Sequence, residues 1–225
     1  MVPRRFSICG LRCLAFVIIV VVYQCASAST VQVKHVTIYC ADDTICSFGI
    51  PNDVIINATP GVQILSQQML LQLTHGSVLE HPFGSNTPPS AALIAVFPGL
   101  AFDSFVAAGG PDSNSPTPTI VGRSDLLGGP GGIPALFSPT QWDVLWGPAL
   151  GQNTVGAHGY LSARLSLNGN ALGTFRYIVN FGDGSSIALN LPIANGLIIP
   201  EPSAIVLTAM LLAISCAILR MARFG

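Results

Sequence analysis

The sequence predicts an all-β domain, an antiparallel β-sandwich or a jelly-roll-like fold, between an N-terminal signal peptide and a single C-terminal transmembrane helix. Two observations predict the β-fold. Apolar and polar residues alternate strictly in several short runs, and Gly, Asn and Asp residues stand between these runs. Period-two alternation is typical of strands with one buried face, and such turn residues connect antiparallel neighbours.

Residues 1–28 have the three-part layout of a secretory signal peptide. Three arginines precede an uncharged apolar run at 13–23, and the small residues Ala26 and Ala28 follow it. An apolar run of this length is too short to span a bilayer comfortably. We therefore expect export and cleavage after Ala28, and the alternative is an uncleaved membrane anchor.

The predicted domain, residues 29–199, carries few charges. The whole chain of 225 residues is 50% hydrophobic and only 8% charged, against about 25% charged in typical soluble domains. Residues 29–199 include four basic and nine acidic residues, a net charge of −5. An acidic domain lacks the electrostatic footprint of a protein that binds nucleic acid, so we expect no nucleic-acid partner.

Two cysteines, Cys40 and Cys46, remain once the terminal segments are removed. In an exported domain, two cysteines across a short polar loop predict a local disulfide. The alternative is a pair of metal ligands, but no second Cys/His pair stands at the spacing of a zinc site. We expect neither a metal nor a cofactor.

The first half of the domain contains weaker strand patterns. Residues 31–39 alternate with one slip in phase, which predicts a β-bulge or a break, and residues 53–59 fit a short strand. Residues 62–73 fit either one face of a helix or a long strand. The apolar runs 91–97 and 101–108 predict two buried strands.

Residues 109–151 predict a long irregular connection, because they contain nine glycines and seven prolines. Trp142 and Trp146 stand four residues apart within this segment, so a short helical turn would place both on one face. One interpretation is that the two rings close one end of the sandwich. The alternative is an exposed pair on which carbohydrate rings stack.

The strongest strand pattern lies at 160–167 and 174–181, on either side of a turn-rich segment that contains Asn-Gly. This arrangement predicts an antiparallel hairpin, and residues 186–193 add a third strand of a meander after Gly182-Asp183-Gly184. Arg164 and Arg176 are expected on exposed faces. The predicted core residues are Leu161, Ala163, Leu165, Leu167, Phe175, Tyr177, Val179 and Phe181.

No motif predicts catalysis. His75 and His81 lie six residues apart, which is not the spacing of zinc ligands on one helical face, and no G-x-S-x-G sequence occurs. A secreted hydrolase that uses paired carboxylates such as Asp103 and Asp143 is the least favoured hypothesis.

Residues 200–225, at the C-terminus, contain a second apolar segment. Residues 203–219 carry no charge and would reach about 25 Å as a helix, enough for a thin bilayer. Arg220 and Arg223 follow at once, and basic residues beside a membrane segment stay in the cytoplasm, which places the domain outside. Pro200 and Pro202 prevent the helix from starting earlier.

This tail resembles the C-terminal sorting signal of PEP-CTERM proteins, which Gram-negative bacteria that make extracellular polysaccharide export. Pro200-Glu201-Pro202, Ser203, the apolar segment and the pair Arg220 and Arg223 match the pattern in order. In that family an inner-membrane protease-transpeptidase, exosortase, recognises Pro-Glu-Pro and removes the tail. A GPI-anchored precursor has a similar layout but usually ends in its apolar stretch.

The domain also looks like uncharacterised β-rich proteins with this tail from planctomycete-type bacteria. The resemblance implies an inner-membrane precursor that is processed and moved to the cell surface or extracellular matrix. We expect a structural or adhesive protein without enzymatic activity, with an exosortase-type enzyme and extracellular polysaccharide as partners. The alternative is a carbohydrate-binding module that uses Trp142 and Trp146.

Overall fold

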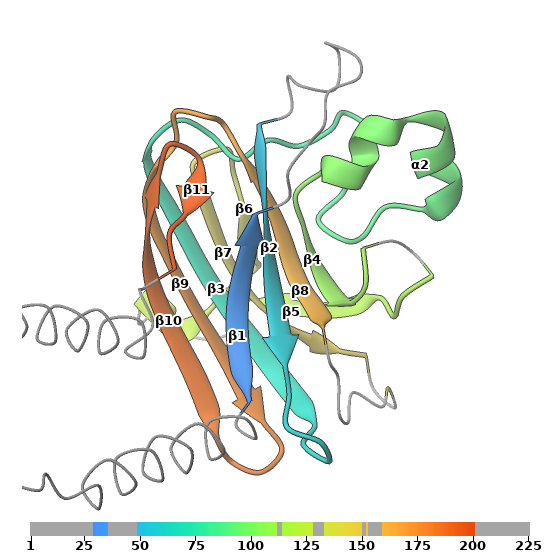
Figure 1. The fold of residues 1–225 in the computed structure, drawn as a ribbon, viewed down its shortest axis with the longest axis vertical. Coiled ribbons are helices and arrows are strands. Elements are labelled where there is room, and N and C mark those ends of the chain that lie inside the picture. Colours follow the sequence, from blue (N-terminus) through green and yellow to red (C-terminus); the bar gives the residue numbers. More distant parts are fainter. Residues whose placement is uncertain are drawn as a thin grey trace, which may run out of the picture.

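A computed structural model of the chain describes residues 29–35, 49–111, 114–127, 133–149, 152 and 159–200. These residues form two antiparallel sheets that pack face to face, with the helix α2 (Ala91–Val96) at the side of the four-stranded sheet (Figure 1). The all-β prediction is therefore confirmed. Within the described ranges no helix has the length and hydropathy to cross a membrane.

Several predicted features lie outside the described residues. They are the signal peptide with Ala26 and Ala28, the cysteines Cys40 and Cys46, and the tail residues Glu201, Pro202, Arg220 and Arg223.

The four-stranded sheet has the order β1-β2-β8-β4, and the seven-stranded sheet has the order β11-β10-β9-β3-β7-β5, with β6 pairing with β7. The strands of the first sheet are β1 (Thr30–His35), β2 (Ile50–Asn57), β8 (Tyr160–Leu167) and β4 (Phe105–Gly109). Those of the second are β11 (Leu197–Ile198), β10 (Ser186–Ala194), β9 (Leu172–Phe181), β3 (Ile64–His75), β7 (Gln141–Pro148), β5 (Pro118–Gly122) and β6 (Leu136–Phe137). The short helical segments are α2 (Ala91–Val96), η2 (Pro98–Phe102) and η3 (Asp125–Leu127).

One hydrophobic core fills the space between the two sheets. The four-stranded sheet contributes residues such as Val54 and Leu165, and the seven-stranded sheet contributes Met69, Trp142 and Phe175, all fully buried. The Trp146 Nε1–H donates to the carbonyl oxygen of Ala107 at 3.1 Å, so the core also holds a polar link between the sheets.

The Asn-Gly-Asn segment at 168–170 does not form the predicted hairpin. β8 lies between β2 and β4 in the four-stranded sheet, whereas β9 lies between β10 and β3 in the seven-stranded sheet. The segment therefore carries the chain across the core. The alternation of apolar residues cannot distinguish a hairpin in one sheet from two strands in facing sheets. In both arrangements the two strands bury every second residue in the same core. The predicted hairpin between β9 and β10 is confirmed.

The predicted core residues of β9 are all buried, but the prediction for β8 is wrong at Leu161. Val54 is opposite Ala163 and Ile55 is opposite Leu161, so Ser162 is an extra residue in β8. This β-bulge reverses the alternation on its N-terminal side. Leu161 consequently packs with Ile55 on the outer side of the four-stranded sheet.

Two further predictions are wrong. Residues 91–97 were expected as a buried strand, but 91–96 form α2, which has no buried residue, because a short apolar run fits a helix as well as a strand. The segment 109–151 was expected to be irregular but contains β5, β6 and β7. Pro118 begins β5 and Pro148 ends β7, where a missing N–H removes no central ladder bond.

Candidate functional site

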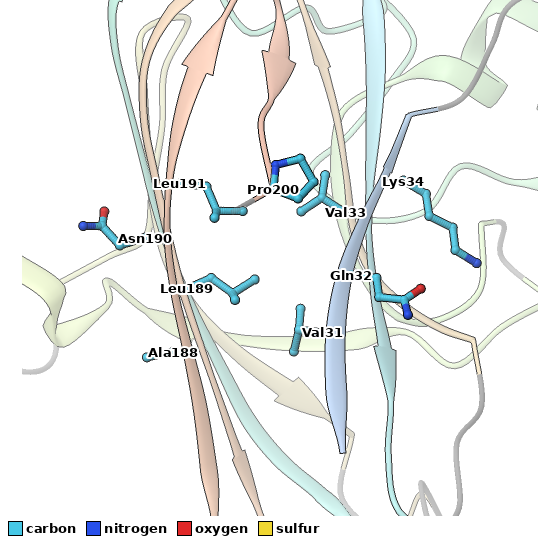
Figure 2. A pocket seen from close by; sticks show the side chains of 9 residues that line it. All are labelled: Val31, Gln32, Val33, Lys34, Ala188, Leu189, Asn190, Leu191 and Pro200. Atoms are coloured by element: carbon cyan, nitrogen blue, oxygen red, sulfur yellow. The ribbon is translucent and has the colours of Figure 1, made fainter. Parts of the chain in front are cut away.

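A groove of about 540 Å³ lies between β1 and β10, the edge strands at the open side of the two sheets. Figure 2 shows Val31 and Val33 of β1 facing Leu189 and Leu191 of β10, with Pro200 between the two strands. Alternation of side chains produces this lining, because every second residue of each strand points between the sheets.

These groove residues belong to the edge of the hydrophobic core. Val31, Val33 and Leu189 are half-buried and pack against the core, and Leu191 is buried. Both strands also have a free backbone edge there. β1 pairs only with β2 among the described residues, and β10 pairs with β11 only through Ile193 and Ala194.

The strand β11 enters this site through a tight turn. Asn195 has φ 52° and Gly196 has φ +74°, which are the left-handed conformations that a two-residue hairpin of type I′ requires. A side chain at Gly196 would also approach the Asn168 carbonyl oxygen at 2.7 Å. The Asn-Gly pair therefore folds β11 back along β10.

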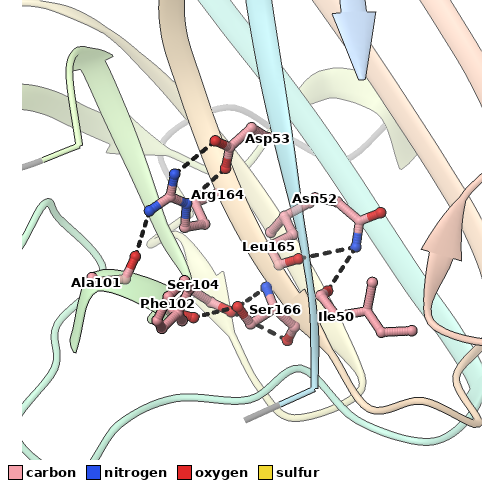
Figure 3. A network of polar contacts seen from close by, with 9 residues as sticks. All are labelled: Ile50, Asn52, Asp53, Ala101, Phe102, Ser104, Arg164, Leu165 and Ser166. Carbon is pink, nitrogen blue, oxygen red and sulfur yellow. Dashed lines mark hydrogen bonds and ion pairs between the residues drawn. The ribbon is translucent and has the colours of Figure 1, made fainter. Parts of the chain in front are cut away.

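Asn52 of β2 holds β11 from the opposite side. This side chain is fully buried, and its Oδ1 accepts a hydrogen bond from the Ile198 N–H at 2.9 Å. Its Nδ2 lies 3.0 Å from the carbonyl oxygen of Gly196 and donates also toward those of Leu165 and Ile50 (Figure 3 shows the last two). One amide thus links β2 and β8 of the first sheet to β11 of the second.

Two more bonds fix the direction in which the chain leaves the domain. His35 Nε2 lies 3.0 Å from the Ile198 carbonyl oxygen, and the Ile199 N–H donates to the Pro192 carbonyl oxygen at 2.9 Å. The backbone of β11 is consequently held between β1 and β10, and Pro200 is directed into the groove (Figure 2).

The groove is suited to an extended apolar segment. Its walls are apolar side chains at two-residue spacing, and its rims are backbone groups without a strand partner among the described residues. A segment that adds to a sheet edge gains main-chain hydrogen bonds, while its alternate side chains enter the groove.

A separate polar cluster anchors η2 to the outer face of the four-stranded sheet (Figure 3). Arg164 forms a bidentate ion pair with Asp53, at 2.6 and 2.7 Å, and also donates to the carbonyl oxygen of Ala101. Ser166 donates to the carbonyl oxygen of Phe102. The prediction that Arg164 is exposed is wrong, since 12% of its side chain is accessible, whereas Arg176 is exposed as predicted.

The bulge in β8 places a polar group in the core. Ser162 donates to Gln67 Oε1 at 2.5 Å and lies 2.7 Å from the Tyr177 hydroxyl, and the Gln67 amide donates to the Tyr160 hydroxyl. Burial raises the pKa of Tyr160 to about 12 and raises that of Tyr177 further. Both phenols therefore remain neutral at physiological pH and act as internal hydrogen-bonding groups.

Asp103 and Asp143, the two carboxylates proposed for a hydrolase, lie at different sheets. Asp143 alternates with the core residues Trp142 and Val144, so it faces away from the core, where it accepts bonds from the Ser124 N–H and hydroxyl. Asp103 precedes β4 at the other sheet and accepts a bond from the His81 N–H at 2.7 Å. Both are buried structural acceptors, and the pair is not a catalytic constellation.

The environment of Asp103 is unfavourable for its charge. Burial raises the pKa of Asp103, against the opposing effect of hydrogen bonds from backbone N–H groups. Burial and the charge of Asp103 together raise the pKa of Glu80. These groups therefore stabilise the fold most at low pH, and their contribution declines as the pH rises through the raised pKa values.

The predicted carbohydrate-stacking pair is wrong. Trp142 and Trp146 are both 0% exposed, because they occupy alternate inward positions of the central strand β7 rather than a helical turn in a loop. The Phe137 ring packs edge-on against Trp142 at 4.9 Å. The other interpretation, in which the two rings close one end of the sandwich, is compatible with their burial.

Sequence reasoning missed the residues that form the groove site. Asn195-Gly196 between two short apolar runs is a strong hairpin signal and could have revealed β11. Nothing in the sequence singles out Asn52 or His35, because the bonds that hold β11 join them to backbone groups more than a hundred residues away. Comparison of the chain with protein-family models, with curated proteins and with solved structures finds no match.

We predict that Asn52→Leu destabilises the domain by about 2–4 kcal/mol, because it leaves the Ile198 N–H and the Gly196 carbonyl oxygen without their partner. Urea unfolding followed by the fluorescence of the buried tryptophans measures the change. Asn190→Ala, at an exposed position of β10, is the matched control and should change stability by less than about 0.5 kcal/mol. Equal stabilities of the two variants would contradict the role of Asn52.

Proposed function

We propose that the chain is an exported surface or extracellular-matrix protein with a structural or adhesive role, delivered by processing of its C-terminal tail. The order of Pro200-Glu201-Pro202, the apolar segment 203–219, and Arg220 and Arg223 supports this route. In the proposed pathway, a signal peptide starts export, the tail halts in the inner membrane, and an exosortase-type enzyme releases the domain.

The end of the domain is compatible with such processing. The last strand, β11, ends at Ile198, two residues before the Pro-Glu-Pro motif. Removal of the residues after Pro202 would therefore take away no strand of the described fold.

The observation that carries the adhesive role is an apolar surface formed by α2 and the loop before it, which we name the α2 surface. Its exposed members are Phe83, Leu93 and Val96, with exposures of 61%, 42% and 66%. The Phe83 ring stacks on the Phe97 ring at 4.7 Å, so part of the surface is an ordered aromatic face. Exposed apolar patches of this kind mark interaction sites on folded domains.

The α2 surface also favours the second candidate function, carbohydrate binding. Aromatic rings combine a large apolar face with a small entropic cost of ordering. The stacked pair Phe83 and Phe97, with the His81 ring 5.7 Å from that of Phe83, provides such a face where Trp142 and Trp146 do not. The proposed ligand is the apolar face of a sugar ring in the extracellular polysaccharide.

The delivery route predicts a specific effect of the Pro-Glu-Pro motif. Replacing Pro200, Glu201 and Pro202 with alanine should leave full-length protein in the inner membrane of the native host, because the processing enzyme loses its recognition sequence. Cell fractionation with a C-terminal tag measures retention, and Pro192→Ala is a control proline outside the motif. Normal trimming and surface delivery of the triple variant would show that the tail is a plain membrane anchor.

The adhesive role predicts that Phe83→Ser combined with Val96→Ser lowers retention of the mature protein in the matrix by roughly tenfold, as expected for the loss of an apolar contact of about 1.4 kcal/mol. A wash-off assay on isolated matrix polysaccharide measures retention. Val121→Ser changes an equally exposed apolar residue on β5 and should have no effect. Unchanged retention of the double variant would exclude the α2 surface as the adhesive site.

A further inference from the structure

A second pocket, of about 320 Å³, lies on the outer face of the seven-stranded sheet. Its lining residues come from η3, β9 and β10, and they are Leu126, Arg176, Ile178, Ala188, Leu189 and Asn190. Figure 2 shows that the Asn190 side chain points away from the groove, on the opposite side of β10 from Leu191. Pockets for small ligands have volumes of about 300–1,000 Å³, so this pocket is at the small end of that range.

The floor of the pocket is formed by two neighbouring cross-strand pairs. Arg176 is opposite Asn190, and Ile178 is opposite Ala188. The intervening residue of β9, Tyr177, is fully buried in the core, so Arg176 and Ile178 point outward. Opposite side chains on one face of a sheet are close neighbours. The pocket therefore has a polar end with a guanidinium and an amide, and an apolar end two residues further along the strands.

The segment η3 orients the guanidinium of Arg176. The Arg176 Nη1 donates to the Leu126 carbonyl oxygen at 2.9 Å. The segment η3 is itself attached to the sheet, because Ser124 donates through its N–H and its hydroxyl to Asp143 Oδ1, at 2.8 and 2.7 Å. Asp143 is buried in β7, so it is a fixed anchor. Arg176 is consequently positioned before a ligand arrives, which lowers the entropic cost of binding.

The positive charge of Arg176 has no carboxylate partner among the described residues. The ion pair recorded there joins Arg164 to Asp53, and no residue that lines the pocket is acidic. An arginine side chain has five N–H donors, and the bond to Leu126 uses one of them. The planar fork that remains matches a carboxylate, which it binds through two parallel hydrogen bonds.

We propose that this pocket binds an acidic sugar, a uronic acid residue of a polysaccharide, through its carboxylate. Arg176 binds the carboxylate, the Asn190 amide forms a hydrogen bond with a ring hydroxyl, and Ile178 and Ala188 support the apolar face of the ring. The proposal rests on the proposed function only in taking the extracellular polysaccharide as the source of the sugar. It involves neither the α2 surface nor the tail.

The position of the pocket favours a sugar over an acidic peptide. β9 pairs with β10 on one side and with β3 on the other, so its backbone has no free edge to which a peptide strand could add. A ligand above β9 therefore meets side chains alone, in a compact site that Leu126 bounds on one side. The net negative charge of the domain has little effect there, because salt screens exposed charges beyond about 8 Å at physiological ionic strength.

Titration of the isotope-labelled full-length chain in detergent with sodium glucuronate tests the proposal. NMR chemical shifts of the Asn190 amide and the Arg176 side-chain N–H groups measure binding. We expect a Kd on the order of 1 mM, since the site is open and offers one charged group. Glucose, which carries a hydroxymethyl group in place of the carboxylate, should bind at least about tenfold more weakly, because hydrogen bonds to charged groups are the stronger ones.

Two substitutions locate the site. Arg176→Gln, at an exposed position, should weaken glucuronate binding by about tenfold, and Arg176→Lys should weaken it less, because lysine keeps the charge but loses the fork. Lys34→Gln is the matched control. It removes one positive charge from an exposed position of β1 that does not line this pocket, and it should leave the affinity unchanged.

Four results would overturn the proposal. They are equal affinities for glucuronate and glucose, equal losses in Arg176→Gln and Lys34→Gln, no shift at roughly tenfold the expected Kd, and tighter binding of a diglutamate peptide than of glucuronate. The last result would assign the pocket to an acidic peptide. Because the α2 surface and the Pro-Glu-Pro motif are tested through other residues, failure of the proposed function is distinguished from failure of this site.

Discussion

The fold depends on one constraint, the complete pairing of the buried Asn52 amide. A buried amide without partners is costly, so its two donors and its acceptor fix the backbone around it. Those partners belong to β2, β8 and β11, which lie in two different sheets. Asn52 therefore fixes the final strand of the seven-stranded sheet, β11, against the four-stranded sheet, and with it the point at which the chain leaves the domain.

The chain leaves the described fold at Pro200, which is one of the residues that line the groove. The two sheets share a core that is open along one side, where half-buried valines of β1 face leucines of β10. An open edge with apolar residues is a liability for a folded domain, because it invites pairing with other chains.

The sequence predicted the all-β class and the core of β9 because alternation depends only on which face is buried. It could not predict that β8 and β9 lie in different sheets, since the hydrophobic pattern of a hairpin and of a crossing between sheets is the same. The sequence could not predict the bulge at Ser162, whose hydroxyl contacts the Tyr177 hydroxyl on another sheet. It also could not predict the burial of Arg164, which depends on its ion pair with Asp53. The groove combines residues 31–34 with residues 188–191 and Pro200, which lie far away at the other end of the domain sequence, so no local motif could have revealed it.

Amide hydrogen exchange at Ile198 tests the role of Asn52 most directly. The Ile198 N–H donates to the Asn52 side-chain oxygen at 2.9 Å. In the Asn52→Leu variant this amide should exchange at least about tenfold faster than in the unchanged chain, whereas the Leu191 amide, which belongs to the ladder between β10 and β9, should stay more protected than Ile198. Equal exchange of the Ile198 amide in the two chains would contradict the account.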